Sequence, residues 1–310
     1  MTERATQNRV PRILCAGGAV QDIVMRVDKF PDAGSKVQAS EFLITSGGQS
    51  GNAAVALARL GCKVSFAGPL GGDDDEVAER ITSILIQEHI DCGGAVRVPG
   101  ALSSVSLILV DARGEKMIAT RRNQGLKAVT PDDPDAAVGA IDAVLLDIHH
   151  QNFVTPICLA AQKRGIPCVL DLDRAVALDD RLLAASSHVI ASAEALRGST
   201  GLSDRAAGLR KLGEHHQGFL AVTDGSDGVY WLDRGTVRHM PAFKVEAIDT
   251  LGAGDVFHGA FTFRLVETGD VIEAMRFAAA AAAIKCTRFG GLMGAATRLE
   301  VDEFLRQRGA

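Results

Sequence analysis

A turn of small residues followed by an acidic residue occupies residues 249–261, which read DTLGAGDVFHGAF. We expect an apolar helix to begin near Gly254, with the backbone N–H groups of its first turn unpaired. Such a helix N-terminus attracts anions, and small side chains let a phosphate group approach it closely. Asp255 would stand in this first turn and accept the proton of an attacking hydroxyl group. The alternative is structural, because an acidic residue also caps or starts a helix.

A second small-residue segment, GGQSGN at residues 47–52, precedes a predicted helix over 52–60 that stops at Gly61. Glycines at 47 and 48 allow a ligand to touch the backbone. Asn52 can donate and accept hydrogen bonds, which suits a ligand with many hydroxyl groups. The segment lacks the G-K-[ST] ending of a P-loop. A plain glycine turn with an N-cap is the alternative explanation.

Two further polar residues follow predicted strands, where ligands of parallel α/β sheets usually bind. Asp22 comes shortly after the predicted strand 13–16, and it could bind a substrate hydroxyl or be a solvated loop residue. His149 follows the strand-like segment 143–146 and is a candidate for substrate contact. Its neighbour His150 cannot point into the same pocket from an extended strand. We expect no metal at this pair, because a third ligand is missing.

Short apolar runs alternate with amphipathic stretches along most of the chain. This alternation predicts βαβ units and an α/β fold with a mostly parallel central sheet covered by helices on both faces. The predicted strands are 13–16, 64–67, 143–146, 168–170, 188–190 and 219–222, and the predicted helices are 52–60, 76–88, 154–164 and one that includes the Ala-rich run 278–283.

Two segments interrupt this alternation and predict a second, small sheet. Residues 103–120 read as a β-hairpin with a four-residue turn at 111–114, and residues 25–43 are short-stranded and rich in turn residues. We expect a single domain over 1–310, with a lid formed by insertions at about 23–46 and 101–124. Another hairpin is predicted over 228–240.

Composition excludes several classes of protein. The chain has 310 residues, 47% of them hydrophobic, and a net charge of -5, which does not suit a nucleic-acid binder. Its six cysteines form no C-x-x-C pair, so we expect reduced thiols rather than a zinc or disulfide framework. No apolar segment is long enough to span a bilayer and the first residues do not resemble a secretory signal, so we expect a cytoplasmic protein that does not bind membranes.

Taken together, these motifs resemble those of the ribokinase-like (PfkB-type) carbohydrate kinases, over about residues 12–306. Residues 249–261 match the C-terminal signature of that family, and Gly47-Gly48 with Asn52 matches its N-terminal signature. The other matching positions, which follow in the expected order, are Asp22, Phe30-Pro31, Val222-Thr223, Gly225 and Gly228.

The resemblance implies a transferase that moves a phosphoryl group from MgATP to a small sugar, with Asp255 as the base. The backbone amides of Gly252, Ala253 and Gly254 would form the anion hole. It also implies dimerisation through the lid and a monovalent cation, such as K⁺, near Asp249 and the loop after Cys286. The implied substrate-binding residues are Asp22, Gly47, Gly48, Asn52, Lys36 and His149, and the implied nucleotide-binding residues are Thr223, Gly225, Gly228, Ser192 and Cys286.

Several positions differ from the ribokinase pattern and predict a sugar other than ribose. Val20 and Gln49 stand where ribokinases often have Asn and Lys, and Ser192-Ala193-Glu194 replaces a magnesium-linked N-x-x-E motif. The C-terminal third is more similar to ketohexokinases and sulfofructose kinase, through residues 241–245 and 285–291. Lys36 matches a sulfonate-binding lysine of the latter, whereas Thr120 and His149 replace its partners. The predicted substrate is therefore a ketohexose or a related, possibly anionic, sugar such as sulfofructose.

Three other functions are compatible with parts of the sequence. A nucleoside kinase of the same fold would need an aromatic residue to stack on the base, for which Phe42 and Phe153 are the nearest candidates. A non-catalytic sugar or nucleotide sensor would not need the intact Gly252–Asp255 motif. A nicotinamide oxidoreductase would need a G-x-G-x-x-G sequence after the first strand, and Gly17-Gly18 has the wrong spacing.

Overall fold

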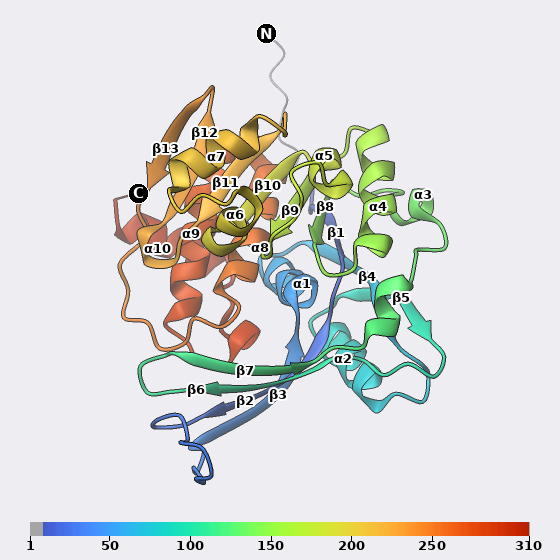
Figure 1. The fold of residues 1–310 in the computed structure, drawn as a ribbon, viewed down its shortest axis with the longest axis vertical. Coiled ribbons are helices and arrows are strands. Elements are labelled where there is room, and N and C mark those ends of the chain that lie inside the picture. The colour runs from blue at the N-terminus through green and yellow to red at the C-terminus, as the bar shows by residue number, and fades with distance from the viewer. Residues whose placement is uncertain (1–8, 310) are drawn as a thin grey trace.

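Nine strands form the central sheet of the protein, whose computed structural model describes residues 9–309 (Figure 1). From edge to edge the order is β13 (Thr236–Met240), β12 (Val229–Asp233), β11 (Phe219–Thr223), β10 (His188–Ser192), β9 (Cys168–Leu172), β8 (Ala143–Asp147), β1 (Arg12–Ala16), β4 (Lys63–Gly71) and β5 (Asp91–Val98). The seven strands from β11 to β5 pair in parallel, and the hairpin of β12 and β13 adds two antiparallel strands.

Helices cover both faces of this sheet, so that strand residues are buried on alternate sides. Ile13 and Cys15 of β1 belong to the hydrophobic core on one face, and Leu14 and Ala16 belong to the core on the other. The first core is completed by α1 (Gln49–Arg59), α2 (Glu76–Gln87), α8 (Ala253–Thr268), α9 (Val271–Cys286) and α10 (Arg298–Gln307). The second is completed by α3 (Pro134–Ala137), α4 (Gln151–Lys163), α5 (Arg181–Ala185), α6 (Ala193–Thr200) and α7 (Arg205–Gly213).

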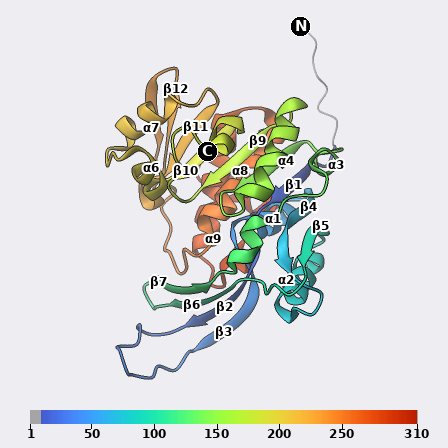
Figure 2. The ribbon, with the colours of Figure 1, turned by 45° about the vertical axis from the view of Figure 1, so that its right-hand side comes forward.

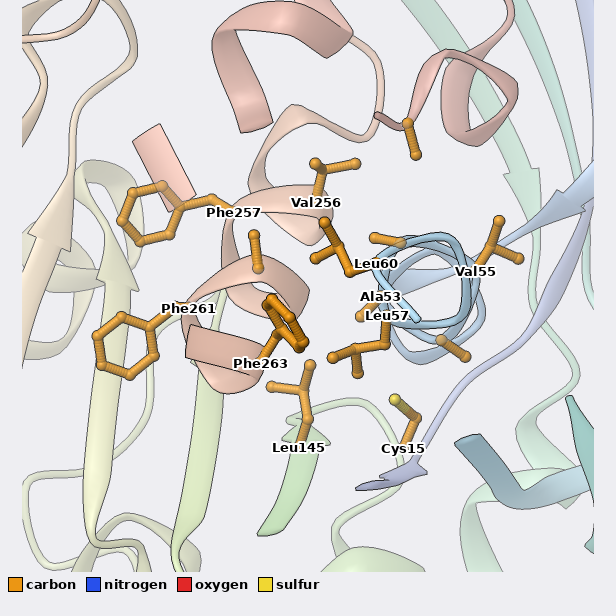
Figure 3. Close-up of a cluster of buried hydrophobic side chains, with 14 of the residues drawn as sticks. Cys15, Ala53, Val55, Leu57, Leu60, Leu145, Val256, Phe257, Phe261 and Phe263 are labelled. Carbon is orange, nitrogen blue, oxygen red and sulfur yellow. The ribbon is translucent and has the colours of Figure 1, made fainter. Parts of the chain in front are cut away.

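Close packing of α1 against α8 brings the two glycine motifs of the sequence together. Leu57 of α1 and Phe263 of α8 lie in one buried cluster, beside Leu145 of β8 (Figure 3). A Cβ atom at Gly259 would lie only 3.0 Å from the Ala53 carbonyl oxygen, so glycine allows this close approach. The N-termini of α1 and α8 therefore lie near each other.

A separate four-stranded sheet projects from the carboxyl ends of the central strands (Figure 2). This small sheet has the order β3 (Glu41–Gly47), β2 (Val20–Arg26), β6 (Val105–Val110) and β7 (Lys116–Arg121). Val24, Ile108 and Val110 pack with Leu251 in a small cluster of their own, which fixes one face of the sheet against the turn before α8. Its other face leaves apolar side chains exposed, among them Phe42 at 60% and Met117 at 49%.

The α/β fold, the small sheet and the hairpin of β12 and β13 confirm the predictions from sequence. Element boundaries differ more: the helix predicted over 52–60 runs from Gln49 to Arg59, and the strand predicted over 64–67 runs from Lys63 to Gly71. Strand β5 and helices α3, α5, α6, α7 and α10 were not predicted. No helix in residues 9–309 is long and apolar enough to cross a membrane.

Candidate active site

Two helices at the centre of the fold begin at glycines and have no side-chain cap. The N-cap of α1 is Gly48, with φ of 81°, and that of α8 is Gly252, with φ of 75°. By contrast, α2, α6, α7, α9 and α10 are each capped by an Asp, Ser or Thr side chain. In these first turns Gly51 N donates to the Gly18 carbonyl oxygen at 3.4 Å and Ala253 N to the Thr250 carbonyl oxygen at 3.3 Å, whereas the N–H groups of Gly254 and Asp255 have no acceptor within residues 9–309. The positive φ at both caps favours glycine.

Asp255 lies in the first turn of α8 and is held by Asn52 of α1. The Asn52 Nδ2 atom donates a hydrogen bond of 2.6 Å to Asp255 Oδ2. The Oδ1 atom of Asn52 is buried and has no partner among the described residues, so it is available to accept a hydrogen bond from a ligand. Burial raises the pKa of Asp255 to about 6, although the hydrogen bond from Asn52 opposes the rise.

A second carboxylate, Asp22 of β2, faces the same space from the small sheet. Its side chain is 6% exposed, and burial raises its pKa to about 7, against a hydrogen bond from Ser106 and with a smaller contribution from the charge of Asp255. A Cβ atom at Gly47 would lie 1.9 Å from Asp22 Oδ2, and one at Gly48 would lie 2.6 Å from the Gly18 carbonyl oxygen. Residues 47 and 48 must therefore lack side chains, because Asp22 and the loop after β1 approach them too closely for a Cβ atom.

Asp147, at the carboxyl end of β8, holds the loops near Asp22 in place through hydrogen bonds. Its side chain accepts hydrogen bonds from Gly18 N at 2.6 Å, Ser50 Oγ at 2.7 Å and His149 N at 2.9 Å. The residue is 1% exposed, so these three donors satisfy a buried charge. Asp147 thus fixes the first loop, the start of α1 and His149 relative to one another.

The His149 ring is part of a charged cluster that the sequence did not reveal. Its Nδ1 atom lies 2.6 Å from Arg122 Nη1, and its Nε2 atom lies 3.0 Å from Asp173 Oδ2. A guanidinium only donates, so Nδ1 is the acceptor and Nε2 carries the proton. Arg174 Nε lies 3.8 Å from Asp173 Oδ1, and Gln49 also donates to Asp173. We call Arg122, His149, Asp173 and Arg174 the arginine cluster.

On the other side of Asp255, a cavity of about 540 Å³ opens between the β11–β12 loops and helices α8 and α9. Its walls are mainly apolar, which suits a nucleotide base. It brings together four of the predicted nucleotide-binding positions and part of the predicted anion hole, namely Thr223, Gly225, Gly228, Cys286, Ala253 and Gly254. A Cβ atom at Gly254 would meet nothing within 4 Å, and its N–H group has no acceptor within residues 9–309, so a ligand can approach this amide.

Three of the predicted positions do not border this cavity or the space before Asp255. Ser192 pairs with Thr223 across neighbouring strands, and its hydroxyl caps α6 by accepting from Ala195 N. Lys36 lies in the exposed loop between β2 and β3 and forms no hydrogen bond or ion pair within residues 9–309. Asp249 is 1% exposed and forms an ion pair with Lys285.

A lysine of the small sheet also reaches this region. A Cβ atom at Gly114, in the turn between β6 and β7, would lie 2.9 Å from the Ile248 carbonyl oxygen, so the turn packs against the segment before α8. Lys116, which begins β7, is close enough for its positive charge to lower the pKa of Asp255. The sequence predicted the hairpin but gave no signal for this lysine.

The fold and the site together fit a kinase for small molecules, because a carboxylate, Asp255, stands at the N-terminus of α8 next to an apolar cavity. Residues 10–297 match the model of the pfkB family carbohydrate kinases, and the chain belongs to that family. It is accordingly an ATP-binding phosphotransferase. The prediction of the family is confirmed.

Individual relatives agree with this assignment. The chain is 31% identical over 299 residues to a ribokinase of Haemophilus influenzae, covering 93% of this chain and 96% of that one. It is 30% identical over 288 residues to a deoxyribokinase of Salmonella typhi, covering 90% and 93%. The structure of an Agrobacterium tumefaciens protein assigned as a candidate ribokinase is 35% identical, with a TM-score of 0.92 over 97% of this chain and 99% of that chain.

Proposed function

We propose that the protein transfers the γ-phosphoryl group of MgATP to a terminal hydroxyl group of a small sugar. The position of Asp255 carries this proposal. Asp255 pairs with Asn52 at the N-terminus of α8, whose residues Ala253 and Gly254 line the 540 Å³ apolar cavity. A nucleotide in that cavity and a sugar held by Asp22 and Asn52 would meet at Asp255.

The proposed reaction needs positioning and charge neutralisation more than covalent help from the protein. Asp255 accepts the proton of the sugar hydroxyl as its oxygen bonds to the γ-phosphorus, and the bond from that phosphorus to the ADP oxygen breaks. The N–H groups of Gly252, Ala253 and Gly254 receive the charge on the transferring group. Asn52 Oδ1, Asp22 and the backbone at Gly47 and Gly48 hold the sugar hydroxyls.

Magnesium would enter with the nucleotide. Residues 9–309 contain no group of three or more His, Cys, Asp or Glu side chains placed to bind a metal ion. Mg²⁺ usually keeps its waters and binds through substrate phosphates plus one or two carboxylates. Glu194 is the carboxylate that we propose for this contact, because it is exposed in the first turn of α6, two residues after Ser192, which pairs with the cavity residue Thr223. The ion would neutralise phosphate charge.

We propose further that the sugar carries an acidic group, which the arginine cluster binds. Both guanidinium groups contact the same ring: Arg122 Nη1 lies 2.6 Å from His149 Nδ1, and Arg174 Nη2 lies 3.5 Å from His149 Nε2. Burial and the positive charge of Arg174 lower the pKa of Arg122. Arg122 forms one hydrogen bond, to His149, and its other N–H groups have no partner within residues 9–309. Free guanidinium donors beside a polar cleft suit a carboxylate, phosphate or sulfonate.

The ribokinases and deoxyribokinase above do not support the ketohexokinase or sulfofructose kinase branch, and ribose remains a substrate to be tested. The arginine cluster is therefore the basis for proposing an acidic sugar. Lys36 would contact such a sugar only after a movement of the β2–β3 loop. A nucleoside kinase of the same fold is the alternative, but neither aromatic candidate is placed to stack on a base, because Phe153 is 1% exposed and Phe42 lies on the outer face of the small sheet. The sensor is disfavoured by family membership and the intact Asp255 site.

The substrate proposal is tested by ADP release from MgATP with ribose, deoxyribose, fructose, adenosine, sulfofructose, fructose phosphates and 2-keto-3-deoxygluconate. We expect an acidic sugar to have the highest kcat/KM. Arg122→Met should lower that value by about 10- to 100-fold, the range for a lost charged hydrogen bond, and should hardly affect neutral sugars. Arg121→Met, an exposed neighbour, is the control. A neutral sugar that is preferred and insensitive to Arg122 would contradict the acidic group but not the kinase.

The small sheet is proposed to act as the lid and as a dimer interface. Its outer strands β3 and β7 are free edges, and exposed strand edges seek partners. Phe42, Leu107 and Met117 are exposed on its outer face at 44–60%. A second copy that covers these side chains would also bring the sheet down over the sugar and exclude water.

Lys116 is proposed to neutralise phosphate charge from the lid. We expect Lys116→Met to lower kcat by about tenfold or more, with little change in the KM for the sugar, because the charge of the transferring group is greatest in the transition state. Lys116→Arg should recover most of the loss. Steady-state kinetics of both variants, with exposed Lys127→Met as the control, would check this. An unchanged kcat in Lys116→Met would contradict the role.

A further inference from the structure

Lys285 is a fully buried lysine in the last turn of α9. Its ammonium donates a hydrogen bond of 2.7 Å to the Asp249 carbonyl oxygen and lies 3.2 Å from Asp249 Oδ2, with the two side chains 0% and 1% exposed. Ala-rich α9 is otherwise packed through apolar residues. A charge placed in such surroundings is costly unless it is fully paired, and a buried ion pair adds little stability by itself.

Asp249, the partner of Lys285, is the first residue of the turn 249–254, which carries the amides of the proposed anion hole. Asp249 Oδ1 accepts from Leu251 N at 2.8 Å, and Oδ2 accepts from Gly290 N and Gly291 N at 3.0 Å each. The backbone N–H groups of residues 248 and 249 both donate to the Cys286 carbonyl oxygen. Lys285 and Asp249 therefore join three segments: the turn 249–254, the end of α9 and the turn at 290–291.

These contacts do not fit the monovalent cation that the sequence predicted near Asp249. Both carboxylate oxygens already accept backbone N–H groups, and the ammonium of Lys285 lies 3.2 Å from Oδ2, so its charge would repel a second cation at this carboxylate. Within the described residues, the positive charge beside Asp249 is the ammonium of Lys285, which also occupies the backbone oxygen of Asp249.

We propose that Lys285 is a positioning residue that provides, as a built-in cation, the positive charge under the turn 249–254, so that the reaction does not require a monovalent metal ion. The proposal rests on the proposed kinase function. Lys285 acts through Asp249: it holds the carboxylate and the backbone of the turn in place, and the turn holds the amides of Gly252, Ala253 and Gly254. Small displacements of such groups have large effects on rate, since a shift of about 1 Å can cost about a hundredfold.

The experiment compares wild type with Lys285→Ala and Lys285→Met in chloride salts of choline, sodium, potassium and ammonium at equal ionic strength. We expect the wild-type kcat to agree within about twofold in all four salts. Lys285→Ala should lose about 10- to 100-fold in kcat in choline, with a smaller change in the KM for the sugar. Ammonium or potassium should restore part of that loss, because the truncated side chain leaves space for a small cation. Lys285→Met fills the space and should not be rescued.

Thermal melting provides a readout that does not depend on the substrate. The melting temperature of Lys285→Ala should rise in ammonium or potassium relative to choline, and those of wild type and of the exposed control Lys163→Ala should not respond to the cation. Wild type that requires potassium, or Lys285→Met with normal kcat, would overturn the proposal. If wild type phosphorylated no sugar, the proposed function would fail while the melting data still decided the cation question. If Lys285→Ala failed to fold, Lys285→Met and the wild-type salt series would decide.

Discussion

Replacement of Asp255 by asparagine should lower kcat by about 10²- to 10⁴-fold, the usual contribution of a general base. Asparagine keeps the size of the side chain and can still contact Asn52, but it cannot accept the proton of the sugar hydroxyl. The KM values for ATP and sugar should change much less than kcat. Steady-state kinetics with the best sugar of the panel would measure the effect, and near-normal kcat would exclude Asp255 as the base.

The pH dependence of this effect follows from the raised pKa of Asp255. Burial brings that pKa to about 6, so the carboxylate is protonated, and inactive as a base, below this pH. We expect Asp255 to contribute a fall in kcat/KM of about tenfold per pH unit below pH 6 in wild type, in addition to the fall that Asp22 causes below pH 7, and this contribution to be absent from the residual activity of Asp255→Asn.

The stability of the same variant gives an independent control. An acid whose pKa is higher in the folded state than in the unfolded state makes folding less favourable once the pH exceeds its unfolded value of about 4. The neutral amide removes this cost, so the melting temperature of Asp255→Asn at pH 8 should be no lower than that of wild type. A large drop would mean that inactivity reflects misfolding instead of the loss of a base.

Much of the fold was predictable because local patterns and the global fold agree. Buried strands such as 143–146 are continuous apolar runs, as parallel strands covered on both faces must be. Strand β5 was missed for a physical reason: it begins Asp91-Cys92-Gly93-Gly94 at the edge of the sheet, where no apolar pattern is required. The start of α1 was misplaced by three residues because its cap is a glycine with positive φ, without the usual side-chain signal.

The two glycine motifs were also predictable, since the groups of each motif that would bind a ligand lie within one short segment of the sequence. The arginine cluster was not, because Arg122, His149 and Asp173 come from three loops and meet only through the order of the strands. The role of Lys285 was not predictable either, although it depends on one helix and not on the meeting of several loops. It sits in an Ala-rich helix at a position that, from the spacing alone, would be expected to hold an apolar core residue.

Replacement of Asp22 by asparagine should weaken binding of the sugar but not of the nucleotide. Asp22→Asn removes the charged acceptor that we propose for a sugar hydroxyl, and a hydrogen bond to a charged group contributes about 1.5–3 kcal/mol. We therefore expect kcat/KM for the sugar to fall by about 10- to 100-fold, with the KM for ATP within about twofold of wild type. Asp28→Asn, an exposed carboxylate beyond the end of β2, is the matched control.

The raised pKa of Asp22 adds a pH dependence to this prediction. Burial brings it to about 7, so in the free enzyme the side chain changes from a neutral acid to a carboxylate as the pH rises through 7. Sugar binding that needs the carboxylate should tighten over this range, whereas Asp255 controls the limb near pH 6. Asp22→Asn should abolish the change near pH 7 and retain the one near pH 6. If both limbs disappeared, the two carboxylates would titrate as one coupled pair, and if neither changed, Asp22 would not contact the sugar.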